Sequence, residues 1–186
     1  MASLEEACID NALSKALTDL QFAAGRRFQL KQEQEVAVRD LQAGKYVLVV
    51  LPTGFGKSLI YQTFVRARDY QLAGKAAIIV ISPLNSIIRD QLDDMELQGY
   101  SAVDASAISL EDIRKCTFKI AFATAEMVRK KPFMEILKTR VLLFTNIAAI
   151  VVDESHTVEI WTGKRYCQVI ILVLKGWFTA DMDRKV

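Results

Sequence analysis

The sequence has few cysteines and a single histidine, and this limits the chemistry that it can carry. Its three cysteines, Cys8, Cys116 and Cys167, lie far apart, without the spacing of a zinc-ligand pair or a redox motif. They are therefore expected to be reduced thiols in an intracellular protein. His156 is the only histidine, so neither a Ser/His/Asp triad nor a metal cluster can be assembled around it.

Long hydrophobic runs are also missing from this sequence. The longest one near the C-terminus, Val169 to Leu174, is far too short to span a bilayer. Glu5, Glu6 and Asp10 fall within the first ten residues, where a secretory signal would be apolar. No repeat, low-complexity segment or linker interrupts the chain. We therefore expect a soluble, intracellular protein that does not enter a membrane.

Length and charge leave the class of partner open. The 186 residues fit one domain, and the 52% that are apolar are enough to bury a sizeable core. A net charge of +2 neither requires a nucleic-acid partner nor excludes one, because a basic groove can lie on a nearly neutral protein.

The apolar residues that are present predict a parallel sheet. Four short runs rich in Val and Ile lack polar alternation, as is typical of strands buried on both faces; they cover residues 46–51, 76–82, 118–123 and 147–153. Segments with helical spacing separate them, which favours βαβ units with helices on both faces. A helix over about residues 32–42 and an N-terminal helix precede the sheet, the latter with the apolar stripe Leu4, Cys8, Leu13, Leu17 and Leu20. The predicted fold is a three-layer α/β domain with a mostly parallel central sheet.

A phosphate-binding loop follows the first of these strands. In the stretch Pro-Thr-Gly-Phe-Gly-Lys-Ser, Gly54 and Gly56 allow a tight turn that brings backbone N–H groups close to an anion. The next helix begins near Lys57, which would reach the β- and γ-phosphates, while the Ser58 hydroxyl would ligate Mg²⁺. Leu51 stands where the general phosphate-loop pattern has its first glycine. The loop predicts nucleotide binding.

A pair of acidic residues follows the fourth strand, on the same side of the sheet as the glycine loop. Asp153 would hold the metal, and Glu154 would orient and deprotonate the attacking water. Two acids after a hydrophobic strand are a weak signal alone, since solvated acids often end strands. About 100 residues beyond a phosphate loop, they indicate an ATPase site.

These two motifs together resemble the first RecA-like lobe of superfamily 2 helicases of the DEAD/DEAH-box type, and their flanks resemble the RecQ group. The resemblance runs from about Phe28 to Arg165. It implies a RecA-like P-loop NTPase lobe over residues 28–165, with ATP and Mg²⁺ as cofactors and Lys57, Asp153 and Glu154 as catalytic residues. It adds Thr53 to the nucleotide-binding set, and it places His156 in the run Asp-Glu-Ser-His as a coupling residue. Residues 1–27 form an N-terminal helical extension.

Further segments resemble other motifs of this family. Gln34, with Lys31 near it, falls at the position of the adenine-binding glutamine, whose planar amide can pair with adenine. Nucleic-acid contacts are implied for Ser82, Asn85, Ser86, Arg89 and Thr124, and, in a loop that couples DNA contact to hydrolysis, for Trp161, Lys164 and Arg165. In the segment after the third strand, Ala125 replaces the family's proline.

The resemblance stops at about Tyr166, and residues 166–186 are interpreted as a divergent C-terminal tail in which Val169–Leu174 can pair as another strand. The second RecA-like lobe and its arginine finger are expected to be missing from this chain. Such fingers contribute about 10³–10⁵ in rate in related ATPases. The isolated chain is therefore expected to bind Mg-ATP weakly, to hydrolyse it slowly and not to unwind DNA.

The leading interpretation is the ATP-binding lobe of a RecQ-type, ATP-dependent DNA helicase that moves 3′ to 5′. Its partner would be single-stranded DNA or a duplex with a 3′ overhang, and the family implies residence in the nucleus. Three alternatives stay open: an RNA helicase of the same superfamily, a truncated module that binds nucleotide or nucleic acid without catalysis, and, more remotely, a P-loop nucleoside kinase. Stronger stimulation of hydrolysis by DNA with a 3′ overhang than by RNA would separate the DNA helicase from the RNA helicase.

Overall fold

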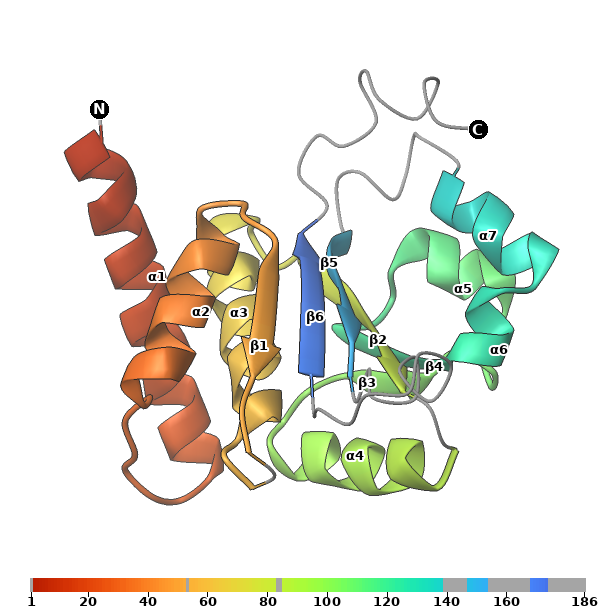
Figure 1. Ribbon diagram of the computed structural model, residues 1–186, viewed down its shortest axis with the longest axis horizontal. Helices are drawn as coiled ribbons and strands as arrows, with labels where there is room; N and C mark the ends of the chain where they lie inside the picture. The colour runs from red at the N-terminus through yellow and green to blue at the C-terminus, as the bar shows by residue number, and fades with distance from the viewer. Residues whose placement is uncertain (1, 53, 83–84, 139–146, 154–167, 174–186) are drawn as a thin grey trace.

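The computed structural model describes residues 2–52, 54–82, 85–138, 147–153 and 168–173. Seven helices and six strands lie in these segments (Figure 1). The helices are α1 (Ala2–Ala23), α2 (Gln32–Gln42), α3 (Lys57–Gln71), α4 (Asn85–Leu97), α5 (Leu110–Lys115), α6 (Ala125–Val128) and α7 (Lys131–Lys138). The strands are β1 (Val47–Val50), β2 (Ala77–Ser82), β3 (Ala102–Asp104), β4 (Ile120–Thr124), β5 (Ile147–Val152) and β6 (Gln168–Val173).

The strands form one sheet in the order β1-β6-β5-β2-β4-β3. Strand β2 pairs in parallel with both β5 and β4, and β3 pairs in parallel with β4. Strand β6 is antiparallel to both β1 and β5, so β1 runs in the same direction as β5. Five strands therefore end at one edge of the sheet, which confirms the predicted mostly parallel arrangement.

Alternate residues of the strands face two separate cores, because successive side chains in a strand point to opposite faces. Ile78 and Val80 pack into the larger core, together with buried residues of α1, α2, α3 and α4. Their neighbours Ala77 and Ile79 face a second core, which includes Ile113 of α5. Helices cover both faces (Figure 1), so the predicted three layers are confirmed.

The N-terminal helix α1 packs closely on α3. Ala12 and Ala16, one turn apart, meet Ala67 of α3 in a buried cluster of small side chains. Small residues let the two helix backbones approach, as ridges of one helix fit into grooves of the other. The predicted apolar stripe extends too far toward the N-terminus, since Leu4 is 77% exposed and Cys8 is also exposed.

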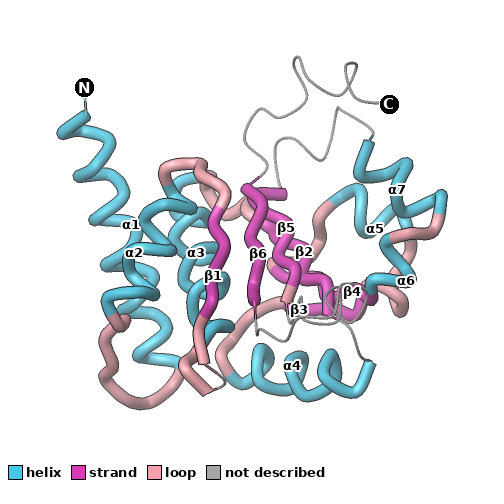
Figure 2. Tube along the Cα trace, in the orientation of Figure 1, coloured by secondary structure: helices cyan, strands magenta, loops and turns pink. Residues whose placement is uncertain are grey.

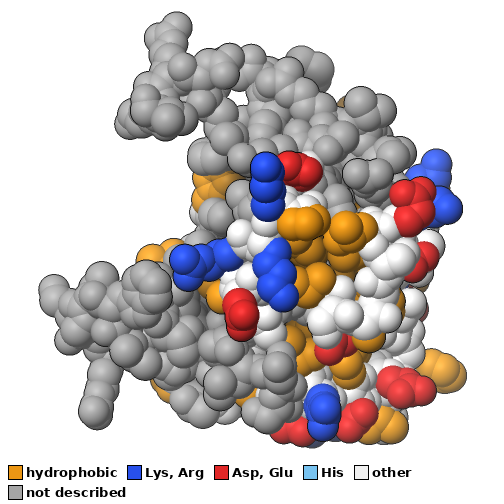
Figure 3. Space-filling model, turned by 90° about the vertical axis from the view of Figure 1, so that its right-hand side faces the viewer, with side chains coloured by type: hydrophobic (Ala, Val, Ile, Leu, Met, Phe, Trp, Pro, Cys, Tyr) orange, Lys and Arg blue, Asp and Glu red, His pale blue; other side chains and the backbone are white. Residues whose placement is uncertain are grey.

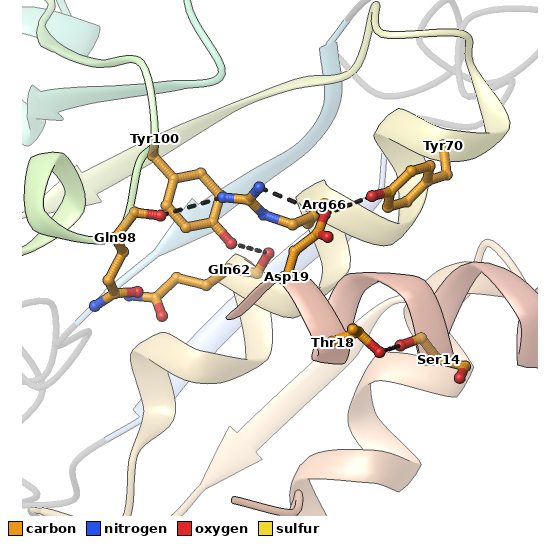
Figure 4. A network of polar contacts seen from close by, with 8 residues as sticks. All are labelled: Ser14, Thr18, Asp19, Gln62, Arg66, Tyr70, Gln98 and Tyr100. Carbon is orange, nitrogen blue, oxygen red and sulfur yellow. Dashed lines mark hydrogen bonds and ion pairs between the residues drawn. The ribbon is translucent and has the colours of Figure 1, made fainter. Parts of the chain in front are cut away.

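A polar network fastens α1, α3 and the end of α4 to one another (Figure 4). The Arg66 guanidinium of α3 lies 4.3 Å from the centroid of the Tyr100 ring and donates to the carbonyl oxygen of Gln98 at 3.3 Å. It also faces the carboxylate of Asp19 on α1, at 3.7 Å. The Tyr100 hydroxyl donates to the carbonyl oxygen of Gln62 at 2.9 Å. Arg66 of α3 therefore contacts both α1 and the segment that follows α4.

Candidate functional site

The loop between β1 and α3 turns on glycines in the left-handed region. Gly54 has a φ of +77° and Gly56, which caps α3, has a φ of +88°. A Cβ at residue 56 would lie only 2.8 Å from Nε2 of Gln34, whereas a Cβ at residue 54 would meet nothing within 4 Å. Glycine is therefore required at 56 for both conformation and space.

Gln34 ties helix α2 to this loop. Its side chain is 2% exposed, and Nε2 donates to the carbonyl oxygens of Phe55 and Gly56, both at 3.0 Å. Its Oε1 accepts from the backbone N–H of Lys31 at 2.9 Å. The Lys31 ammonium lies 3.7 Å from the centroid of the Phe55 ring. The amide predicted to read adenine thus makes three bonds to main-chain groups, and pairing with adenine would require it to exchange some of them.

Lys57 begins α3 and turns its side chain back over the loop. Its Nζ lies 3.4 Å from the carbonyl oxygen of Leu51 and 3.3 Å from that of Pro52. Both acceptors are neutral carbonyl oxygens, so no carboxylate among the described residues balances the ammonium charge. An anion in the loop would compete well with two neutral carbonyl oxygens for this cation.

Asp153 lies immediately after β5 and is nearly buried, at 8% exposure. Its backbone N–H donates to the carbonyl oxygen of Ile81 at 2.9 Å, which continues the pairing of β5 with β2. Its Oδ2 accepts from Nε2 of Gln91 on α4 at 3.1 Å. Burial raises the pKa of the Tyr61 hydroxyl on α3, and the charge of Asp153 raises it further. The carboxylate therefore acts electrostatically on the first turns of the helix that Lys57 begins.

The loop after β1 and the acid after β5 emerge at the same edge of the sheet (Figure 2). One strand, β6, separates β1 from β5, so their ends are two strand spacings apart, or about 10 Å. A bound phosphate chain with its cation can span such a distance. Within the described part of the chain, no three His, Cys, Asp or Glu side chains gather as a metal site. Magnesium is usually bound by one or two carboxylates together with substrate phosphates and water.

A cavity of about 350 Å³ lies beside the loop, where α1, α2, α3 and α4 come together. The side chains around it mix apolar and polar groups, and they include the residues that anchor the loop; the lining is Leu20, Ala24, Arg26, Phe28, Gln29, Lys31, Gln34, Phe55, Gly56, Ser58, Leu59, Gln62, Asp94 and Gln98. Its size is that of a small-ligand pocket. Lys57 and Asp153 lie outside this lining, on the loop and at the sheet edge.

The residues predicted to contact nucleic acid follow neighbouring strands at the same edge. Ser82 ends β2 and pairs in register with Thr124 at the end of β4. Ser82 is 1% exposed, and its hydroxyl has no hydrogen-bond partner among the described residues. The Thr124 hydroxyl caps α6 by accepting from the backbone N–H of Met127 at 3.2 Å. Of this group, Arg89 on α4 presents an exposed side chain.

Several predicted site residues lie outside the described part of the chain: Thr53, Glu154, His156, Trp161, Lys164 and Arg165. Asn85 and Ser86 begin α4, but their side chains are also outside the description. The roles of all eight stay predictions. Ser58, the predicted magnesium ligand beside Lys57, lies in the first turn of α3 and lines the cavity.

The structure also draws attention to residues that the sequence motifs did not single out. Gln91 contacts Asp153 across 62 residues of sequence, a pairing that helical spacing alone cannot reveal. Three basic residues in a row are exposed just after α6: Arg129, Lys130 and Lys131. This run of basic residues is visible in the sequence alone. The side of the molecule seen in Figure 3 carries Lys and Arg side chains interspersed with acidic and apolar ones.

The chain is similar in sequence to known helicases. The DEAD/DEAH box helicase family matches residues 31–185. The chain is 31% identical over 139 residues to the ATP-dependent helicase SGS1 of Saccharomyces cerevisiae, covering 70% of the chain and 10% of that protein. It is 34% identical over 140 residues to the ATP-dependent DNA helicase Q5 of Rattus norvegicus, covering 69% and 14%. To the ATP-dependent DNA helicase RecQ of Bacillus subtilis it is 26% identical over 142 residues, covering 72% and 22%.

The chain thus spans between 10% and 22% of the length of these relatives. Within the described residues, no helix has the length and apolar character needed to cross a membrane. The family match covers most of the chain, and the four predicted strands all run in one direction in the sheet. The chain belongs to the DEAD/DEAH box helicase family, as a RecQ-like superfamily 2 lobe.

Proposed function

We propose that this chain is the ATP-binding lobe of a RecQ-type DNA helicase, in which hydrolysis of Mg-ATP drives 3′-to-5′ movement on DNA. The observation that carries the proposal is the shared sheet edge. The loop that leads through Gly56 to Lys57 follows β1 at this edge, and Asp153 follows β5 there, two strand spacings away. Transfer of the terminal phosphoryl group of ATP to water would supply the free energy for this movement.

The loop residues are suited to bind the phosphates. Gly54 and Gly56 keep the backbone open so that its N–H groups and the N-terminus of α3 can face an anion. The Lys57 ammonium would leave the carbonyl oxygens of Leu51 and Pro52 and move onto the phosphates, where a charge-assisted contact is stronger. Thr53 would complete this loop.

The metal and the water are assigned to the ends of α3 and β5. The Ser58 hydroxyl and the Asp153 carboxylate would hold Mg²⁺, which would neutralise charge on the phosphates. Glu154 would orient the attacking water and accept its proton. His156, in the run Asp-Glu-Ser-His, would couple this nucleotide site to the nucleic-acid contacts.

The cavity beside the loop is proposed to take the adenine ring. Lys31 and Gln34 line it, and the Gln34 amide offers a donor and an acceptor of the kind that adenine requires. Because this amide also donates to the carbonyl oxygens of Phe55 and Gly56, one side chain would both fix the loop and recognise the base.

DNA is proposed as the nucleic acid, because relatives such as Q5 and RecQ carry the name of DNA helicases. The strand would cross the edge formed by the ends of β2 and β4, with Ser82, Asn85, Ser86, Arg89 and Thr124 nearby and Trp161, Lys164 and Arg165 in the coupling loop. Ser82 is buried as the structure stands, so its contribution requires neighbouring side chains to move. In a eukaryotic cell this substrate places the protein in the nucleus.

The test compares nucleic acids as activators of ATP hydrolysis by the whole chain. Phosphate release is measured with a DNA duplex carrying a 3′ overhang, with RNA of the same sequence, and with neither. Hydrolysis is expected to rise more with DNA than with RNA, and Lys57→Ala is expected to abolish the rise. Equal or greater stimulation by RNA would favour the RNA helicase alternative. Mg-ATP binding without any stimulated hydrolysis would favour the non-catalytic module.

A further inference from the structure

We propose that Gln91 is a positioning residue that orients the carboxylate of Asp153 and joins helix α4 to the proposed magnesium site. The inference rests on the proposed function and names a residue to which that function assigns no role. Nε2 of Gln91 lies 3.1 Å from Oδ2 of Asp153, although the two residues are 62 positions apart in the sequence. Helix α4 lies across the sheet edge at which β5 ends (Figure 1).

The type of side chain at 91 suits a group that orients a metal ligand. A carboxylate can rotate about its Cβ–Cγ bond, and a hydrogen bond to Oδ2 fixes its plane and therefore the direction of its other lone pairs. An amide donor is neutral, so it leaves intact the negative charge that attracts a cation. A lysine or arginine at the same place would compete with that cation. Neutral donors of this kind commonly hold metal ligands in place.

The other end of the Gln91 amide supports the same conclusion. Its Oε1 is buried and has no hydrogen-bond partner among the described residues. A buried amide oxygen without a donor costs folding free energy, so such a group usually has a function or a missing partner. The water molecules around a hydrated magnesium ion are donors, and Mg²⁺ keeps several of them when it binds to proteins. A ligand of this chemistry would satisfy Oε1.

Gln91 also lies on the helix that carries predicted nucleic-acid contacts. Asn85 and Ser86 begin α4, and the exposed Arg89 precedes Gln91 by two residues. A strand that contacts the first turns of α4 would act on the same rigid helix that holds Asp153. Binding of the strand and of the metal would therefore influence each other, and such coupling is reciprocal.

The experiment measures the affinity of a non-hydrolysable ATP analogue by calorimetry, with excess Mg²⁺ and with EDTA. The whole chain is compared with Gln91→Leu, which removes the amide and retains most of the volume. We expect the Mg²⁺-dependent gain in affinity to fall about tenfold or more in Gln91→Leu, as for other residues that support metal ligands. Affinity in EDTA should equal that of the unmodified chain, and higher Mg²⁺ concentrations should restore part of the loss.

Gln42 provides a matched control. It is buried, its Nε2 donates to the carbonyl oxygen of Phe64 at 3.2 Å, and its Oε1 also lacks a partner among the described residues. Gln42→Leu therefore removes the same kind of group from the joint between α2 and α3. It should change thermal stability without changing the effect of Mg²⁺. If Gln91→Leu fails to fold by circular dichroism, Gln91→Met, a flexible side chain of similar length, replaces it.

The outcomes separate this inference from the proposed function. An unmodified chain whose affinity does not depend on Mg²⁺ would overturn the proposed magnesium site itself. If Mg²⁺ matters in the unmodified chain and equally in Gln91→Leu, the positioning role alone is overturned. An equal loss in Mg²⁺ and in EDTA would also overturn it, because that pattern indicates a general structural effect. Finally, single-stranded DNA should change the affinity of the unmodified chain for the analogue, and this change should be absent in Gln91→Leu. If DNA does not change the affinity of the unmodified chain, the link to α4 is overturned.

Discussion

The side-chain amide of Gln34 donates to the carbonyl oxygen of Gly56 at 3.0 Å, so helix α2 holds the last residue of the loop that leads into α3. The same nitrogen would be 2.8 Å from a Cβ at residue 56. The loop is thus fitted against a side chain that also lines the neighbouring cavity. Loop conformation and ligand binding are expected to respond together to changes at either residue.

Gly56→Ala should abolish nucleotide binding while the chain still folds. An alanine there adopts a left-handed conformation, at a cost of about 1–2 kcal/mol, and also displaces the Gln34 amide. Gly74→Ala is the matched control, since Gly74 has a φ of +80° and open space for a Cβ. Both variants should lose unfolding free energy in urea, and Gly56→Ala should lose more because it also displaces the Gln34 amide. Only Gly56→Ala should lose nucleotide affinity, and equal affinities in the two variants would contradict the account.

Gln34→Ala should reduce the preference for ATP over GTP. Removing the amide frees the carbonyl oxygens of Phe55 and Gly56, so affinity for both nucleotides should fall. If the amide also reads adenine, ATP should lose about tenfold more than GTP, equivalent to about 1.4 kcal/mol. Competition titrations with the two triphosphates measure this. An equal loss for both would show that Gln34 anchors the loop without reading the base.

Arg66→Ala should destabilise the fold by about 2 kcal/mol, because it removes the stacking on Tyr100 and the charge-assisted bond to the Gln98 carbonyl oxygen. Arg66→Lys should recover only part of this, since an ammonium lacks the planar fork. Urea unfolding measures the difference.

Lys45→Ala provides the contrast for Arg66. Lys45 forms an ion pair with Asp40 at 2.6 Å, and the two side chains are 65% and 38% exposed to solvent. Exposed pairs contribute little, so the variant should lie within about 0.5 kcal/mol of the unmodified chain. An Arg66→Ala variant as stable as Lys45→Ala would show that the network of Figure 4 does not hold the helices together.

Most of the framework was predictable because its signals are local. The apolar runs mark β1, β2, β4 and β5 to within a few residues, and the expected helix over 32–42 coincides with α2. Strand β3 was missed, since three residues carry too little pattern to recognise. The run at 169–174 was recognised as a possible strand, but its place and its antiparallel direction between β1 and β5 depend on the whole sheet.

The site was predictable to the level of its motifs and no further. Gly54, Gly56, Lys57 and Asp153 could be named because phosphate and metal binding need those residue types after strands. The contacts of Gln34 with the loop and of Gln91 with Asp153 join segments far apart in the sequence, and only the packing of α2 and α4 brings them together.

The central claim is that the loop after β1 and the acid after β5 serve one magnesium-nucleotide site. The most direct measurement is the affinity of an ATP analogue for Lys57→Ala and Asp153→Asn, each with Mg²⁺ and with EDTA. Lys57→Ala should lose affinity in both conditions, because its ammonium meets the phosphates themselves. Asp153→Asn should lose only the gain that Mg²⁺ provides. Unchanged Mg²⁺ dependence in Asp153→Asn, or unchanged affinity in Lys57→Ala, would contradict the account.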